Sequence, residues 1–331
     1  MKKKRMIIIL LVVVFGAAIV GASYGLAGSI GQVEQPPTLV SGSSETVDLW
    51  QIAPTSAFTL YLPLTAKHWP SNPQKGVGII APPGCTDADI LNAGWYFNWQ
   101  AAPPAGCDPL DGRFVPRISD AGGLAALPTA IANAQASGWL IGFNEPNLPW
   151  QSNISPADGA VLWRQIENAA LPAGIKLVSP APNQFAPGQE DPYGHQWLWA
   201  MVNAYEAQYG QKPHFDAFGW NLYGCTNNPN CLDVNEMKSF LIQRRQEAQN
   251  RGYTGPIWLL EIGGCQTENS SASDQTVMRE MGQWFNQTEW IARYAWFSNR
   301  TANSFQGNHN CALIENGSNN LTTLGQLYKG L

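Results

Sequence analysis

The stretch WLIGFNEPNLPWQSNISPADGAVLWRQIENAALPAGIKLVS (residues 139–179) contains two short apolar runs with a helical pattern between them. Ser155 is a good helix N-cap and Pro156 suits the first helical position, which predicts a helix over 156–170. The flanking runs 139–143 and 176–179 show no alternation of polar and apolar residues, as in strands buried on both faces. The stretch therefore predicts two parallel strands joined by a crossover helix.

The same alternation continues on both sides. Strands are predicted at 77–80, 93–99, 114–118, 139–143, 176–179, 215–222, 257–262 and 291–297. Helical patterns cover 124–134, 156–170, 193–209, 234–250, 273–285 and 324–331. Eight such strands indicate a single (β/α)8 barrel of the α/β class. A doubly wound open sheet is the rival, but no Gly-x-Gly-x-x-Gly opens a helix.

The N-terminus has the pattern of an export signal. Four basic residues at positions 2–5 precede an uncharged run that extends to about residue 31. We expect residues 1–31 to be a signal peptide or a membrane anchor, in which case residues 6–23 are the possible tether. Residues 32–75 are then a Pro/Ser-rich linker, and 76–331 form the main domain. Both fates of the N-terminal segment place that domain outside the cytoplasm, secreted or tethered at the cell surface.

All six cysteines follow this segment, which favours disulfides in an oxidising compartment. Six cysteines allow 15 pairings. Our working assignment is Cys85–Cys107, Cys225–Cys231 and Cys265–Cys311. No Cys-x-x-Cys pair or histidine cluster is present, so we expect no metal and no cofactor.

The composition favours a neutral partner. Without the first 23 residues, 15 basic residues stand against 24 acidic ones, which excludes nucleic acid as a probable ligand. The chain has 14 Trp. Aromatic rings stack on the apolar faces of sugars, so this content indicates a neutral polysaccharide as substrate. Trp150, Trp197 and Trp199, in or near loops, are candidates for this contact, and we expect the protein to act as a monomer.

Chemistry in a (β/α)8 barrel lies at the carboxyl ends of its strands. Polar and aromatic side chains at the predicted ends are Asn98, Trp99, Arg117, Asn144, Glu145, Asn183, Asn221, Tyr223, Glu261, Trp296 and Ser298. Glu145 and Glu261 end the fourth and seventh apolar runs, on opposite sides of the barrel mouth. Loss of solvation raises the pKa of such an acid, and glycosidic-bond hydrolysis uses two facing carboxyl groups.

Four segments in this order resemble a known family: GWYFNW (94–99), GFNEPN (142–147), WLLEIG (258–263) and RYAWF (293–297). Together they resemble glycoside hydrolase family 128, over roughly 76–331. The resemblance implies a retaining endo-β-1,3-glucanase with Glu145 as acid/base and Glu261 as nucleophile. It implies that Asn144 bonds the sugar 2-hydroxyl and that Tyr223 donates to Glu261. The sugar platform would consist of Trp95, Asn98, Trp99 and Trp296.

The sequence departs from the family at two positions. Asn221 stands where many relatives have His, so this position can offer hydrogen bonding to the site but no proton transfer. Leu260 stands where a Thr often precedes the nucleophile. Two alternatives remain open: the same mechanism on another β-glucan or a β-mannan, and a non-catalytic glycan-binding barrel at the cell surface. The presence of both glutamates argues against the second.

Overall fold

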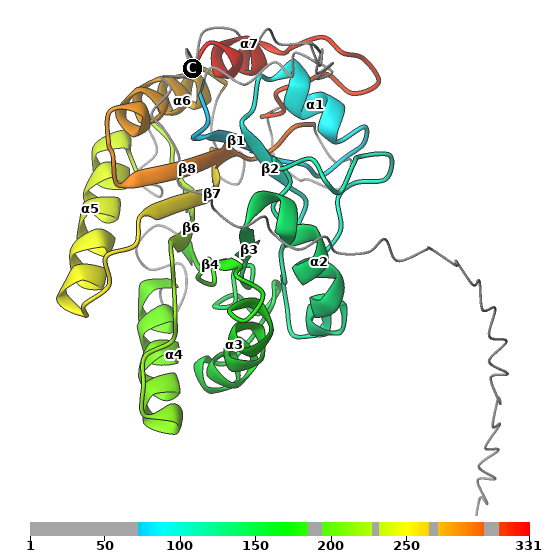
Figure 1. Ribbon diagram of the computed structural model, residues 1–331. Coiled ribbons are helices and arrows are strands. Elements are labelled where there is room, and N and C mark those ends of the chain that lie inside the picture. Colours follow the sequence, from blue (N-terminus) through cyan, green and yellow to red (C-terminus); the bar gives the residue numbers. More distant parts are fainter. Residues whose placement is uncertain (1–71, 185–193, 227–231, 265–270, 301–310) are drawn as a thin grey trace, which may run out of the picture. The chain divides into compact units, whose positions relative to one another are not determined.

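A computed structural model describes residues 72–184, 194–226, 232–264, 271–300 and 311–331 (Figure 1). The expected signal or anchor at 1–31 and the linker up to residue 71 lie outside the described residues. Strand β1 begins at Lys75, one residue before the expected start of the domain. Among the described helices, none combines the length and the apolar character needed to cross a membrane.

The strands form a ring of parallel pairs, which confirms the predicted (β/α)8 barrel. They are β1 (Lys75–Gly78), β2 (Trp95–Phe97), β3 (Trp139–Ile141), β4 (Lys176–Val178), β5 (Asn183–Gln184), β6 (Phe218–Tyr223), β7 (Ile257–Gly263) and β8 (Ile291–Trp296). One sheet has the order β2-β1-β8-β7-β6-β5, and β3 pairs with β4. Single parallel bridges complete the ring at Tyr96–Phe114, Arg117–Ile141 and Val178–Ala217.

Helices surround the strands in the described part of the barrel (Figure 1). They are α1 (Cys85–Ile90), the 3-10 helix η1 (Gly122–Ala126), α2 (Leu127–Ser137), α3 (Pro156–Ala170), α4 (Gly194–Tyr209), α5 (Val234–Asn250), α6 (Ser271–Asn286) and α7 (Thr323–Lys329). The predicted bounds of α3 and α5 are confirmed. Ser155 caps α3 by accepting from the Asp158 N–H, and Asp233 and Glu236 form a capping box on α5.

Two predicted strands are less regular than expected. The third, 114–118, is reduced to bridges at Phe114 and Arg117. The fifth, predicted at 176–179, forms β4, and the short strand β5 follows it beyond Pro180 and Pro182. Proline has no N–H to donate to a ladder, and Pro116 interrupts the third strand in the same way. Helix α1 was not predicted, because six residues without a side-chain cap leave little local signal.

The buried apolar side chains form two large clusters. One consists only of residues on or beside strands, among them Phe97, Ile141, Leu260 and Ala295, and it fills the barrel interior. The other joins the outer faces of the strands to the helices. Because alternate residues of a strand point to opposite faces, this division decides which side chains can reach the barrel mouth.

Candidate active site

A cavity of about 590 Å³ lies at the carboxyl ends of the strands. Its walls come from β7 and the third strand position, and from the segments that follow β1, β2, β3 and β8. The lining residues include Ile80, Trp99, Arg117, Ser119, Asn144, Trp150, Glu261 and Phe297. This is the position at which enzymes of this architecture bind their substrates. Three residues that the sequence analysis predicted for the site line this cavity: Trp99, Asn144 and Glu261.

Glu261 points inward because of an irregularity in β7. Trp258 and Leu260 belong to the interior cluster, whereas Ile257 and Leu259 belong to the outer one. Simple alternation would turn Glu261 outward. The pairing with β6 passes from Trp220–Leu259 directly to Asn221–Glu261, so Leu260 is an extra residue. This bulge turns Glu261 to the inside, as bulges beside active sites commonly re-aim a side chain.

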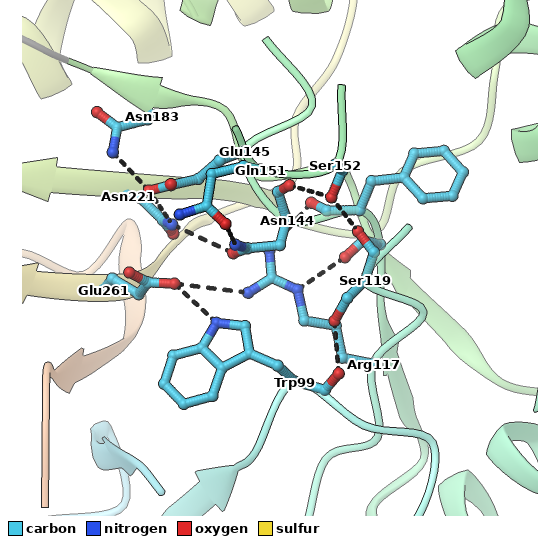
Figure 2. A network of polar contacts seen from close by, with 12 residues as sticks. Trp99, Arg117, Ser119, Asn144, Glu145, Gln151, Ser152, Asn183, Asn221 and Glu261 are labelled. Carbon is cyan, nitrogen blue, oxygen red and sulfur yellow. Dashed lines mark hydrogen bonds and ion pairs between the residues drawn. The ribbon is translucent and has the colours of Figure 1, made fainter. Parts of the chain in front are cut away.

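Hydrogen-bond donors surround the Glu261 carboxylate (Figure 2). The indole Nε1–H of Trp99 donates to Oε1 over 2.8 Å, and the Tyr223 hydroxyl donates to Oε2. Arg117 Nη1 lies 4.0 Å from Oε1. Glu261 is only 3% exposed. These groups replace the water that a buried carboxylate loses, and they stabilise its charged form.

Glu145 follows the isolated bridge at Asn144, beyond the end of β3, and is held by amide side chains from β5 and β6 (Figure 2). Asn183 and Asn221 both donate to its Oε1, the latter over 2.8 Å. These two asparagines are register partners on adjacent strands, and Asn221 is in turn the partner of Glu261. Glu145 has a left-handed backbone, with φ 42°. It is 1% exposed and does not itself line the cavity.

Burial raises the pKa of both carboxyl groups of the site. For Glu145, burial and then the charge of Glu261 together raise the pKa to about 8, against the opposing effect of Asn221, Asn183 and Arg117. Burial raises the pKa of Glu261 too, but Arg117, Tyr223 and Trp99 all oppose that rise. The pKa of Tyr223 lies well above its usual value because the hydroxyl is buried, so it remains a donor. The raised pKa keeps Glu145 protonated at neutral pH, whereas the donors and the positive charge beside Glu261 favour the charged form of that residue.

Replacing Glu145 by glutamine is expected to stabilise the fold at alkaline pH. The unfolded chain releases the Glu145 proton near 4.5, whereas the folded protein holds it to about 8. Stability is therefore lost as pH rises between these values, and Glu145→Gln removes the loss. We expect its melting temperature to exceed the wild type's by roughly 4 °C or more at about pH 9, with little difference near pH 4. Equal melting temperatures at both pH values would contradict the raised pKa.

Arg117 is a site residue whose importance the sequence did not reveal. Its Nε and Nη2 donate to the carbonyls of Gly142 and Phe143, over 2.9 and 3.0 Å, and Nη1 faces Glu261. Burial lowers its pKa to about 10, which still leaves it protonated at neutral pH. The guanidinium thus connects the segment leading to Glu145 with the other carboxylate. Its place at the end of a predicted strand was the available signal.

Three residues of the expected sugar platform lie elsewhere. Trp95 points inward but is completely buried near the start of β1, where its Nε1–H donates to the Gln74 carbonyl. Trp296 belongs to the outer cluster and donates to the Cys311 carbonyl. Asn98 bonds Ala102 within its own loop and does not line the cavity.

The structure places other aromatic rings in the wall. Strand alternation brings Phe297, one residue after Trp296, to the cavity. Trp150 lines it as well and is 63% exposed. Trp197 and Trp199 are buried instead, donating to Ile154 and Glu247 respectively. The cavity wall therefore combines Trp99, Trp150 and Phe297.

The predicted disulfide Cys85–Cys107 is confirmed. Cys225 and Cys311 are also disulfide-bonded. The expected pairings Cys225–Cys231 and Cys265–Cys311 each include a cysteine outside the described residues. Within the part of the chain that the structure describes, no group of three or more His, Cys, Asp or Glu side chains is placed to hold a metal ion.

The family model for the glycosyl hydrolase catalytic core matches residues 81–328, nearly the whole barrel. The chain belongs to this family. This glycosyl hydrolase has no match among curated proteins. Its sequence-based assignment to glycoside hydrolase family 128 is confirmed by this match together with the solved structures that resemble it.

Three solved structures of family 128 illustrate the likeness of this glycosyl hydrolase. A subgroup II endo-β-1,3-glucanase from Sorangium cellulosum is 27% identical, with a TM-score of 0.61, over 77% of this chain and 97% of that one. One from Pseudomonas viridiflava is 25% identical with TM-score 0.61, over 78% and 97%. A subgroup I enzyme from Amycolatopsis mediterranei, in complex with laminaritriose, is 25% identical with TM-score 0.58, over 78% and 99%.

Proposed function

We propose that the protein is an exported, retaining endo-β-1,3-glucanase in which Glu145 is the acid/base and Glu261 the nucleophile. The observation that supports it most is the asymmetry between the two buried carboxyl groups. Glu145 keeps its proton to about pH 8, whereas Glu261 lines the cavity beneath donors that favour its charge. A protonated acid beside an ionised carboxylate is what a retaining glycosidase requires in its resting state.

The proposed reaction has two displacements. Glu145 gives its proton to the glycosidic oxygen while a Glu261 oxygen bonds the sugar C1, and the C1–O bond to the leaving chain breaks. Glu145, now ionised, takes a proton from water as that water attacks C1, and the bond to Glu261 breaks. The configuration at C1 is inverted twice and therefore retained.

The amide side chains have separate proposed roles. Asn144, in the cavity wall, is placed to bond the sugar 2-hydroxyl, and Asn221 donates to Glu145 without being able to take its proton. Because Glu145 does not line the cavity in this structure, its role requires a change of side-chain rotamer when the glycan binds. Contacts of this kind often become optimal only in the substrate complex.

The substrate and the location are inferred from several observations. The relatives named above are endo-β-1,3-glucanases, and one holds laminaritriose. Disulfide bonding fits an oxidising compartment, in agreement with an export segment at 1–31, a linker at 32–75 and a catalytic domain from 76.

The full chain, produced under oxidising conditions, is expected to release oligosaccharides from soluble β-1,3-glucan. Chromatography of the early products separates internal cleavage from removal of terminal glucose, and NMR during hydrolysis reports the first anomer formed. We expect oligosaccharides of several lengths with the β-anomer first. Activity confined to cellulose or mannan would contradict β-1,3-glucan as the substrate and leave the proposed mechanism in place. Binding of glycans without any hydrolysis would contradict the proposed enzyme.

A further inference from the structure

Trp99 differs from the other aromatic residues of the cavity because its polar atom is directed at a carboxylate. Its Nε1–H donates to Glu261 Oε1 over 2.8 Å, and the ring is half-buried in the wall (Figure 2). We propose that Trp99 is a positioning residue. Its indole N–H fixes the orientation of the Glu261 carboxylate and favours its charged form for attack on the sugar C1. This inference rests on the proposed function, and it assigns Trp99 a role other than a sugar platform.

The backbone of Trp99 is in the left-handed region, with φ 58°. A bulky residue adopts this conformation only where its surroundings enforce it. The Ser119 hydroxyl donates to the Trp99 carbonyl over 2.6 Å and holds the backbone from the neighbouring segment. The local chain geometry is therefore maintained by a contact that involves neither the ring nor a sugar.

The ring itself is fixed by close packing on three sides. Its centroid lies 4.7 Å from that of Phe97 and 5.6 Å from that of Phe297. Gly78 in β1 leaves room for the ring tip, because a Cβ at this position would lie 2.8 Å from Trp99 Cη2. The indole plane, and with it the N–H direction, is set by the protein before any glycan binds.

The chemistry of the donor suits this role. An indole N–H can donate but neither accepts nor titrates, so it always favours the ionised carboxylate. Tyr223 donates to the other oxygen, which leaves the carboxyl group bonded from two directions. The titratable and charged groups that face Glu261 among the described residues are Arg117, Tyr223 and Glu145. Trp99→Phe removes one of these hydrogen bonds to Glu261 while an apolar ring and the charges of Arg117 and Glu145 remain.

The test compares Trp99→Phe with the wild type on soluble β-1,3-glucan across pH. Phenylalanine retains a ring and removes the N–H, so we expect kcat/KM at the optimum to fall about tenfold or more. Because a lost donor disfavours the carboxylate, the acidic limb of kcat/KM moves to higher pH. An unchanged acidic limb with only a raised KM would overturn the inference and restore the sugar-platform role.

Trp150→Phe is the matched control, since it makes the same substitution at a tryptophan that lines the same cavity but is 63% exposed and is not among the hydrogen-bond partners of Glu261. We expect it to raise KM while the acidic limb stays in place. An equal shift of the limb in this variant would show that any disturbance of the wall has the same effect, and would contradict a specific role of the N–H.

Gly78→Ala provides a second variant that keeps the tryptophan. The added methyl group displaces the ring tip and lengthens the bond to Glu261, so the acidic limb moves in the same direction as in Trp99→Phe. Circular dichroism and thermal melting verify that each variant is folded. Absence of hydrolysis by the wild type on every β-glucan would refute the proposed function, whereas an active wild type with an unmoved limb in both variants refutes this inference alone.

Discussion

Glu261→Gln is expected to lower kcat on β-1,3-glucan by at least about 10⁴-fold, and Glu145→Gln by about 10²–10⁴-fold. The loss is larger for Glu261 because glutamine cannot form the covalent intermediate. Both variants should remain folded, since glutamine has nearly the same shape and Glu145→Gln still accepts from Asn183 and Asn221. Reducing-end release over time, with the melting temperature of each variant, measures both effects.

Glu167→Gln is the matched control for this pair. Glu167 is also buried and hydrogen-bonded, to Tyr205 and to the His214 N–H, but it lies outside the cavity. We expect it to lose stability and to keep its activity when folded. Full activity in Glu145→Gln or Glu261→Gln would remove that residue from its proposed role.

The alanine variants distinguish the two roles chemically. An aryl β-glycoside with a good leaving group needs little acid assistance, so Glu145→Ala should still form the glycosyl-enzyme and then stall. Azide, which needs no general base, should restore turnover and give the β-glycosyl azide. With Glu261→Ala, azide would have to attack from the vacated side and give the α-product. The reverse pattern would exchange the two assignments.

Arg117→Met is expected to reduce kcat/KM by about 10²-fold or more, since preorganised donors at a developing charge commonly contribute this much. The variant removes the Arg117 donor from the Gly142 carbonyl and one of two donors from the Phe143 carbonyl, which still accepts from the Ala181 N–H. It also removes the positive charge beside Glu261. The pKa of Glu261 then rises, so the acidic limb moves to higher pH. Rate profiles against pH and thermal melting measure both consequences.

Arg117→Lys separates the charge from the geometry. Lysine keeps the charge but cannot reproduce the forked contact with two carbonyls. Compared with Arg117→Met, we therefore expect Arg117→Lys to return the acidic limb toward its wild-type pH but to recover less of the thermal stability. Arg113→Met is the control, because Arg113 pairs with Asp89 and Asp111 away from the cavity. A value of kcat/KM in Arg117→Met within threefold of the Arg113→Met value would contradict the proposed connection between Arg117 and the carboxylates.

Local sequence signals were sufficient for the architecture. A cap such as Ser155 acts within one turn, so the bounds of α3 could be predicted without knowledge of the rest of the fold. Strands that are apolar on both faces already imply a covered parallel sheet. The same signals placed Glu145 and Glu261 at strand ends, and both residues lie there in the structure, although their roles await the experiments above.

The orientation of individual side chains was a different matter. The family resemblance implied that Trp95 and Trp296 belong to the sugar platform, but Trp95 lies too deep in the barrel and Trp296 faces the helices. Depth and facing depend on the register between neighbouring strands, which no single segment encodes. Phe297 lines the cavity for the same reason.

The sequence by itself determined a barrel of eight strand positions with two glutamates at strand ends. It also gave the aromatic-rich composition and the expectation that the barrel lies outside the cytoplasm. Only the tertiary structure decided that Glu261 turns inward. Leu260 becomes the extra residue of a bulge only when β7 pairs with β6. Tertiary contacts likewise place Arg117 and Trp99 beside that carboxylate. Periodicity is a local property of a chain, whereas the environment of a buried charge is the sum of contacts between distant segments.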